Sequence, residues 1–254
     1  MCVACYGPHA DLARRFLESL YACTNPKRFT LRAGLNEVEP ETLRLFRERA
    51  ERHGNVELFI EPANTFKNPL MRRIFHERPL TTEWTVWCDD DTHFTRPDWL
   101  ARLRRRIRKY PSVAVWGAMY FQVNRNREFL QWIRSATWYR GLPFERPIDP
   151  AEAADPEAGR FVFASGGFWA ARTEALQELD WPDPRLLQAA EDVAFGEALR
   201  QNGYLVGPFE YGVRVSDAPR RNASAPEIRN PPPRSAVLSR RRSTARRGSG
   251  PGPT

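Results

Sequence analysis

Hydrophobic positions along the first half of the chain follow two patterns. Short apolar runs are typical of buried strands, and spacings of i, i+3 and i+4 mark one face of a helix. The two patterns alternate, which indicates βαβ units and an α/β fold with a mostly parallel sheet. We predict strands at residues 2–6, 28–35, 56–60, 84–88 and 113–116. We predict helices over residues 12–20, 40–54 and 69–76, and another from residue 97.

In the second half of the chain, we expect one strand to end at a pair of glycines. Residues 161–165 have a strand pattern, Gly166 and Gly167 follow, and a helix begins at about Thr173. Paired glycines permit a positive φ or the close approach of a ligand to the backbone, and they also suit an ordinary turn. Residues 141–159 are rich in proline and acids, which predicts a mobile loop.

The charge of the chain divides it into a domain, residues 1–218, and a tail, residues 219–254. The tail carries nine arginines and one acid, so it accounts for the whole net charge of +8. The high pI is therefore no sign that the domain binds nucleic acid. Proline, serine, glycine and arginine dominate the tail, which predicts disorder. The tail can contact anionic lipid or nucleic acid, but a solvated tail without a specific role is the favoured interpretation.

The chain shows neither an apolar run of membrane-spanning length nor a signal peptide. Four cysteines without a secretion signal predict reduced thiols and a cytoplasmic protein, with a peripheral position at the inner membrane face as a variant. Cys2 and Cys5 are three residues apart in a predicted strand and should point to opposite faces, which argues against a zinc or redox pair.

Three acids, Asp89, Asp90 and Asp91, directly follow the predicted strand at residues 84–88. Ligands of open α/β sheets bind beyond the carboxyl ends of the strands. Adjacent carboxylates repel one another, and Mg²⁺ or Mn²⁺ is the simplest compensation, although a solvated acidic turn is the alternative. If the segment is extended, the side chains of Asp89 and Asp91 point to the same side and the side chain of Asp90 points to the other.

A second acidic pair, Glu191 and Asp192, precedes residues that can form one apolar helix face. Asp192 would then lie near the helix N-terminus, where free backbone N–H groups stabilise an anion. The alternative is that Asp192 only caps the helix.

These motifs, in this order, resemble the GT-A glycosyltransferases, and family 2 most closely. The resemblance covers residues 2–217 and rests on three segments: a strand ending in Asp-Asp-Asp, Ser-Gly-Gly-Phe-Trp-Ala-Ala-Arg at residues 165–172, and Glu-Asp-Val at residues 191–193. The first and last segments also look like the fringe and β-1,3-glycosyltransferase group. The resemblance implies a Rossmann-like GT-A fold and metal-dependent, inverting transfer of a sugar from a nucleotide-diphosphate donor, with a UDP-sugar expected. The acceptor would be a hydroxyl of a glycan, lipid or other molecule.

The resemblance also implies roles for the acids. Asp91 would be the principal ligand of Mn²⁺ or Mg²⁺, and Asp89 would lie nearest the sugar nucleotide and share the metal, with Asp90 beside it. Asp192 would take the proton of the acceptor hydroxyl, and Glu191 would orient it. Asp217 stands where the family often has a histidine as third metal ligand.

Donor-binding residues follow from the same resemblance. Asn36 stands where the family usually has an aspartate that holds the nucleotide base, and an amide can also pair with uracil. Lys67 and Arg72 suit diphosphate oxygens. Gly166 and Gly167 would let the donor approach the backbone.

Two other functions remain open from the sequence. A sugar-phosphate nucleotidyltransferase would normally have a Gly- and Arg-rich loop after its first strand, which residues 6–10 lack. A non-catalytic protein that binds a nucleotide sugar or nucleic acid is the third interpretation. The acceptor side is open too, because the apolar cluster Phe129, Trp132, Ile133, Trp138 and Tyr139 can either stack on sugar rings or form core.

Overall fold

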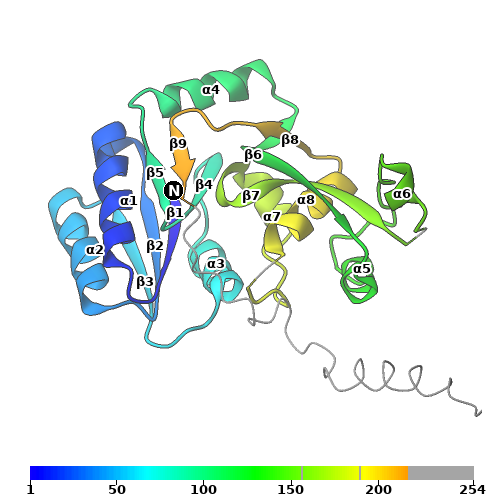
Figure 1. The fold of residues 1–254 in the computed structure, drawn as a ribbon. Coiled ribbons are helices and arrows are strands. Elements are labelled where there is room, and N and C mark those ends of the chain that lie inside the picture. The colour runs from blue at the N-terminus through cyan, green and yellow to red at the C-terminus, as the bar shows by residue number, and fades with distance from the viewer. Residues whose placement is uncertain (156, 189, 217–254) are drawn as a thin grey trace, which may run out of the picture.

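The computed structural model describes residues 1–155, 157–188 and 190–216, and it contains two β-sheets. The large sheet has seven strands: β1 (Cys2–Tyr6), β2 (Leu31–Asn36), β3 (Val56–Glu61), β4 (Trp84–Asp89), β6 (Val113–Asn124), β7 (Gly159–Arg172) and β8 (Leu205–Pro208). Their order in space is β3-β2-β1-β4-β7-β6-β8 (Figure 1). The small sheet pairs β5 (Thr92–Phe94) with β9 (Val213–Val215).

The large sheet is parallel except for one strand. The pairs β1–β2, β2–β3, β1–β4 and β6–β8 are parallel, and β7 runs antiparallel to both β4 and β6. The mostly parallel α/β fold expected from the sequence is therefore confirmed. Because the carboxyl ends of β1, β2 and β4 meet at one edge, residues that follow these strands lie together there.

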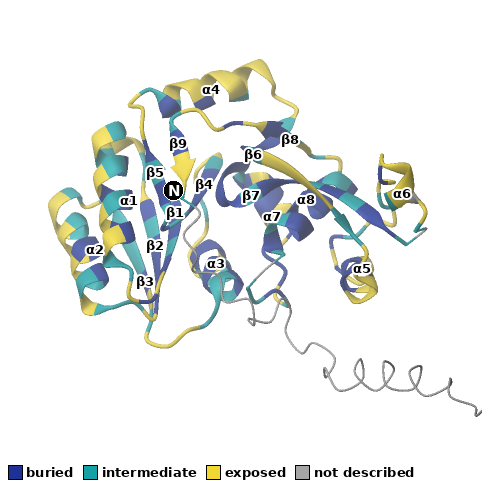
Figure 2. Ribbon diagram, in the orientation of Figure 1, coloured by how far each residue is buried: buried dark blue, intermediate teal, exposed yellow. Residues whose placement is uncertain are grey.

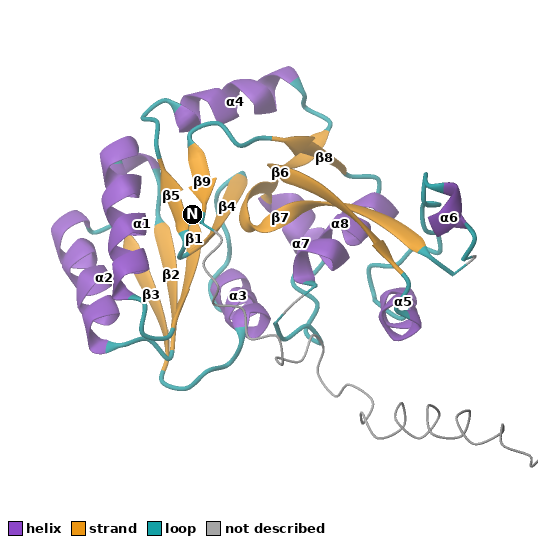
Figure 3. Ribbon diagram, viewed as in Figure 1, coloured by secondary structure: helices purple, strands orange, loops and turns teal. Residues whose placement is uncertain are grey.

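Helices cover both faces of the sheet (Figure 3). They are α1 (Ala10–Cys23), α2 (Pro40–His53), α3 (Lys67–His76), α4 (Trp99–Lys109), α5 (Arg127–Arg134), α6 (Pro150–Ala153), α7 (Thr173–Glu178) and α8 (Glu191–Gln201), with a 3₁₀ helix at Pro26–Arg28. Apolar residues of α1, α2 and α4 belong to one core, and those of α3, α5, α7 and α8 to another. Figure 2 shows the buried strands between helices that are exposed on their outer sides.

The central strands contribute side chains to both cores, because successive side chains of a strand point to opposite faces of the sheet. In β1, Cys2 belongs to the core beneath α3, and Val3 and Cys5 belong to the core beneath α1. Cys2 and Cys5 therefore face opposite sides of the sheet, as predicted.

Three predicted boundaries were wrong. The second strand begins at Leu31, since Pro26–Arg28 form a 3₁₀ helix whose Lys27 N–H donates to Asn25 Oδ1. The strand predicted to end at Trp116 continues to Asn124. The glycine pair lies inside β7 and does not end it.

Within residues 1–155, 157–188 and 190–216, none of the helices combines the length and hydropathy needed to cross a bilayer. The tail predicted at residues 219–254 and the candidate ligand Asp217 lie outside the described residues.

Candidate active site

A cavity of about 350 Å³ lies at the carboxyl ends of β1, β2 and β4. Its lining includes the last residue of each of these strands, Tyr6, Asn36 and Asp89. Asp90 and Asp91 also line it. The structure therefore brings the acidic triplet and the predicted base-binding residue onto one surface, at the edge where open α/β sheets bind ligands.

The acidic triplet leaves the sheet through a turn. Asp89 is the last residue of β4, and its Oδ1 accepts a hydrogen bond of 3.1 Å from the indole N–H of Trp87. Asp90 is buried, with its Oδ2 3.4 Å from the backbone N–H of Tyr6. Since Asp90 and Asp91 form a turn, the alternation expected for an extended segment does not apply to them. Burial raises the pKa of Asp89, and the nearby Lys67 ammonium opposes that increase.

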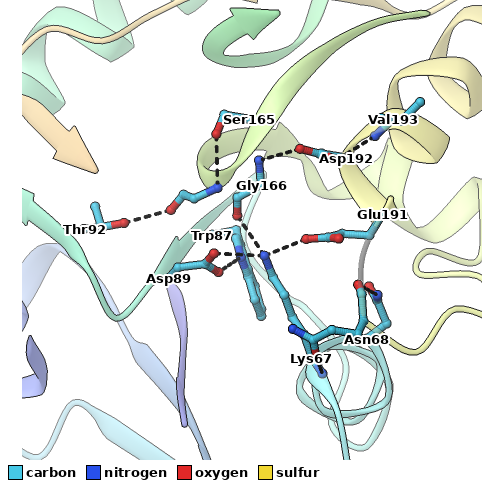
Figure 4. A network of polar contacts seen from close by, with 12 residues as sticks. Lys67, Asn68, Trp87, Asp89, Thr92, Ser165, Gly166, Glu191, Asp192 and Val193 are labelled. Carbon is cyan, nitrogen blue, oxygen red and sulfur yellow. Dashed lines mark hydrogen bonds and ion pairs between the residues drawn. The ribbon is translucent and has the colours of Figure 1, made fainter. Parts of the chain in front are cut away.

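The ammonium group of Lys67 connects the triplet to the second acidic motif (Figure 4). Its Nζ lies 3.0 Å from Asp89 Oδ2 and 2.6 Å from Glu191 Oε1. Burial alone would lower the pKa of Lys67, but the charges of Asp89 and Glu191 outweigh burial and hold that pKa above its usual range. Two motifs that are far apart in the sequence thus share one cation.

Asp192 is the second residue of α8 and not its cap. The N-cap position belongs to Ala190, which has φ +63° and makes no side-chain capping bond. Asp192 Oδ2 accepts from the N–H of Gly166 at 3.3 Å, and its Oδ1 accepts from the N–H of Val193 at 2.9 Å. Burial and the neighbouring Glu191 charge raise the pKa of Asp192 to about 6. A carboxylate of that pKa is suited to accept a proton near neutral pH.

Gly166 and Gly167 are required because other groups approach the backbone closely. Neither has a positive φ. A Cβ on Gly166 would lie 2.8 Å from Glu191 Oε1, and a Cβ on Gly167 would lie 2.6 Å from Val215 Cγ1. The alternative of an ordinary turn is wrong because both glycines lie inside β7, and the close approach of side chains is the physical reason for the pair. Gly167 lines the cavity, so the expectation that the donor meets this backbone stays a prediction.

Asn36 is buried at the end of β2, and its amide organises the loop before α3. Its Oδ1 accepts from the N–H of Thr65 at 2.9 Å, and its Nδ2 donates to Asn64 Oδ1 at 3.0 Å. Asn36 and Asn64 both line the cavity. Contact of Asn36 with a nucleotide base remains a prediction.

The structure does not bring Arg72 into the cavity. Arg72 is not part of the cavity lining, and its guanidinium donates to the Asp180 carboxylate at 2.9 Å and to the Pro182 carbonyl at 2.8 Å. This arrangement ties α3 to the segment after α7.

The residues that are present fit a divalent cation shared with a substrate. Asp89, Asp90 and Asp91 line the cavity, and carboxylate oxygens are the ligands that Mg²⁺ and Mn²⁺ prefer. Among the described residues, no three His, Cys, Asp or Glu side chains converge as a ready metal cage. Mg²⁺ sites commonly use one or two carboxylates with substrate phosphates and water, so a complete protein cage is not needed.

Sequence reasoning missed several cavity residues. Tyr120 lines the cavity and is 56% exposed, but it lies in β6 beyond the predicted strand end. The apolar residues that continue after Gly117 were the available signal. Arg214 reaches the cavity from β9, a strand too short to predict. The apolar cluster considered for acceptor binding is mostly core: its buried members are Phe129, Trp132, Ile133 and Trp138.

Solved structures with a similar fold include a mannosyltransferase and a protein in complex with UDP-GlcNAc. The mannosyltransferase PcManGT from Pyrobaculum calidifontis, in complex with GDP-Man and Mn²⁺, has a TM-score of 0.59 at 19% identity, over 98% of this chain and 64% of that chain. S. aureus TarS 1-349 in complex with UDP-GlcNAc has a TM-score of 0.52 at 14% identity, over 82% of this chain and 55% of that chain. The chain thus spans less than two thirds of the length of either protein. None of the curated proteins matches the sequence significantly.

A family model identifies the chain more directly than these structures do, since their low identities show the fold alone. The model described as glycosyltransferase like family 2 matches residues 1–231, a range that includes both acidic motifs and every cavity residue named above. The chain therefore belongs to the glycosyltransferase-like family 2 and has a GT-A fold.

Proposed function

We propose that the protein transfers a sugar from a nucleotide-diphosphate donor, a UDP-sugar, to an acceptor hydroxyl with inversion, and that it depends on Mn²⁺ or Mg²⁺. The observation that carries the proposal is that Lys67 Nζ lies within 3.0 Å of both Asp89 and Glu191. The acids assigned to the donor and the pair assigned to proton removal therefore belong to one site.

Asp192 is assigned the role of general base. Its carboxylate accepts from two backbone N–H groups, of Gly166 and Val193, which fix its orientation. With its pKa raised to about 6, it is ionised at neutral pH and more basic than an ordinary aspartate. Removal of the proton from the acceptor hydroxyl as that oxygen attacks the sugar gives a single displacement, and hence inversion.

The donor diphosphate is assigned to the acidic side of the cavity. Asp91 and Asp89 would hold the divalent cation, which neutralises the charge left on the departing nucleotide diphosphate. The nucleotide and the sugar would lie against Asn36, Asn64 and the backbone at Gly167, which line the cavity. Asp217 stays proposed as a further ligand.

A donor panel tests the proposal. Hydrolysis of UDP-, GDP- and other nucleotide sugars should depend on Mn²⁺ or Mg²⁺, stop with a chelator and be fastest with a UDP-sugar. NMR of the first product should show the opposite anomeric configuration to the donor.

Two results would contradict the proposal. Retention of configuration would exclude a single displacement in which Asp192 acts as the general base. Pyrophosphate release from a nucleoside triphosphate and a sugar 1-phosphate, without hydrolysis of any nucleotide sugar, would identify a nucleotidyltransferase instead.

A further inference from the structure

Lys67 lines the cavity, but its ammonium group already contacts three acceptors of the chain itself. A lysine ammonium carries three N–H donors. Lys67 Nζ lies within hydrogen-bonding distance of three acceptors: Asp89 Oδ2 at 3.0 Å, Glu191 Oε1 at 2.6 Å and the Gly166 carbonyl at 3.2 Å. The side chain is 14% exposed. A diphosphate that bound this ammonium would compete with these three acceptors, of which Glu191 is the more buried carboxylate.

The backbone around Lys67 is tied to the segment that leads into α8. The Lys67 N–H donates to Gln188 Oε1 at 3.2 Å, and the N–H of the next residue, Asn68, donates to the Leu187 carbonyl at 3.0 Å. Asn68 is 1% exposed. The start of α3 therefore contacts both the end of β4, through the ammonium group, and the approach to α8, through the backbone.

We propose that Lys67 is a positioning residue that fixes Asp89 against Glu191, and thereby sets the distance between the donor site and the general base, and that it is not a phosphate ligand. The inference rests on the proposed function. Lys67 holds the first acid of the triplet and the residue before Asp192 on one nitrogen atom. Loss of the ammonium would leave the carboxylates of Asp89, which is partly exposed, and Glu191, which is mostly buried, without the cation between them, and their repulsion would move Asp192 away from the acceptor hydroxyl.

The test separates nucleotide binding from turnover. Lys67→Met keeps a linear side chain and removes the charge, and Lys109→Met makes the same change at an exposed lysine as a control. Calorimetry with UDP and Mn²⁺ gives Kd, and donor hydrolysis gives kcat and KM. For Lys67→Met we expect a UDP Kd within about threefold of the wild-type value and a kcat lower by about 10²-fold, the scale of a misplacement of about 1 Å. Lys67→Arg should recover part of kcat because it keeps the charge.

A second variant covers the case in which Lys67→Met does not fold. Glu191→Gln keeps the shape and hydrogen-bonding capacity of the side chain but removes the charge that faces Lys67, and it should lower kcat with little effect on the UDP Kd. If both single variants fold, their effects on kcat should be non-additive in the double variant, since each removes the same ion pair.

Three outcomes would overturn the inference. A UDP Kd raised about tenfold or more in Lys67→Met with kcat unchanged would identify a phosphate ligand. An unchanged kcat, or additive effects of the two variants, would show that Lys67 positions nothing. A wild type that hydrolyses no nucleotide sugar would overturn the proposed function, and this inference with it, whereas an active wild type with the outcomes above overturns the inference alone.

Discussion

Replacement of the base by its amide, Asp192→Asn, should remove activity and make the folded protein more stable at neutral pH. The pKa of Asp192 in the folded protein is about 6, against 3.8 for an ordinary aspartate. A raised pKa means that folding favours the protonated form. The wild type therefore has its full stability below the unfolded-state pKa and loses part of it as the pH rises through about 6.

The size of this effect follows from the two pKa values. A shift of about two pKa units corresponds to about 3 kcal/mol, reached above pH 7. Between about pH 4.5 and pH 7.5, the wild type should lose about 2 kcal/mol relative to Asp192→Asn. The side chain keeps some contact with solvent, so this figure is an upper value. The asparagine also loses one of the two backbone hydrogen bonds, which lowers its stability by about 1 kcal/mol at every pH and leaves the pH dependence intact.

Urea unfolding of both proteins across this pH range, with chelator and without nucleotide, measures the effect. The difference in free energy of unfolding should grow in favour of Asp192→Asn as the pH rises. Asp11→Asn, at an exposed carboxylate in the first turn of α1, controls for the loss of a negative charge near a helix N-terminus. A difference that is the same at every pH would refute the claim that Asp192 is a destabilised, basic carboxylate.

Four further predictions follow from the same geometry. The rate of transfer should fall as the pH drops through about 6, because Asp192 becomes protonated, and Asp192→Asn should lower the rate by about 10² or more at neutral pH and abolish this pH dependence, as pH–rate profiles will show. Asp91→Asn should weaken Mn²⁺-dependent UDP binding, since a carboxylate ligand becomes a neutral amide, and calorimetry that finds equal affinity would contradict its role as a metal ligand. Gly167→Ala should lower the free energy of unfolding by about 1–3 kcal/mol, because its Cβ would lie 2.6 Å from Val215 Cγ1, and urea unfolding will measure the loss. A chain that ends at residue 222 should keep its melting temperature and UDP affinity, because the excess charge lies beyond the domain, and loss of either would show that the tail contacts the domain.

The first half of the fold was predictable because local signals there agree with the tertiary structure. The strands β1 and β3 and the helix α2 match their predicted ranges within one residue, and Gly54 ends α2 with φ +65°, as a C-terminal glycine should. In each case the hydrophobic period and the terminal residues indicate the same element.

The second half was harder to predict because its strands do not show one period. The outer half of β6 leaves the hydrophobic core, and residues 119–122 are exposed on both faces, so neither alternation nor a continuous buried run marks it. In β7, Gly166 and Gly167 indicated a turn, although the strand continues through them. What decides the conformation is the close approach of Glu191 and Val215, and this contact joins distant parts of the chain.

The site shows the same division between local and distant information. The sequence located the acids of both motifs, because clustered carboxylates after a strand and before a helix are local signals. It assigned a metal as the compensation for the charge of the acidic triplet and did not predict the ion pair between Asp89 and Lys67. That ion pair depends on how α3 packs against β4 and α8. One ammonium group, that of Lys67, pairs with the first acid of the triplet and with the first acid of the second motif. Burial is the largest cause of the raised pKa of Asp192, and the charge of Glu191 raises that pKa further. The charge of Glu191 therefore links the two motifs, because it pairs with the ammonium group that also holds Asp89 and it makes Asp192 more basic. A variant that removes this charge should alter both the ion pair and the pKa of Asp192.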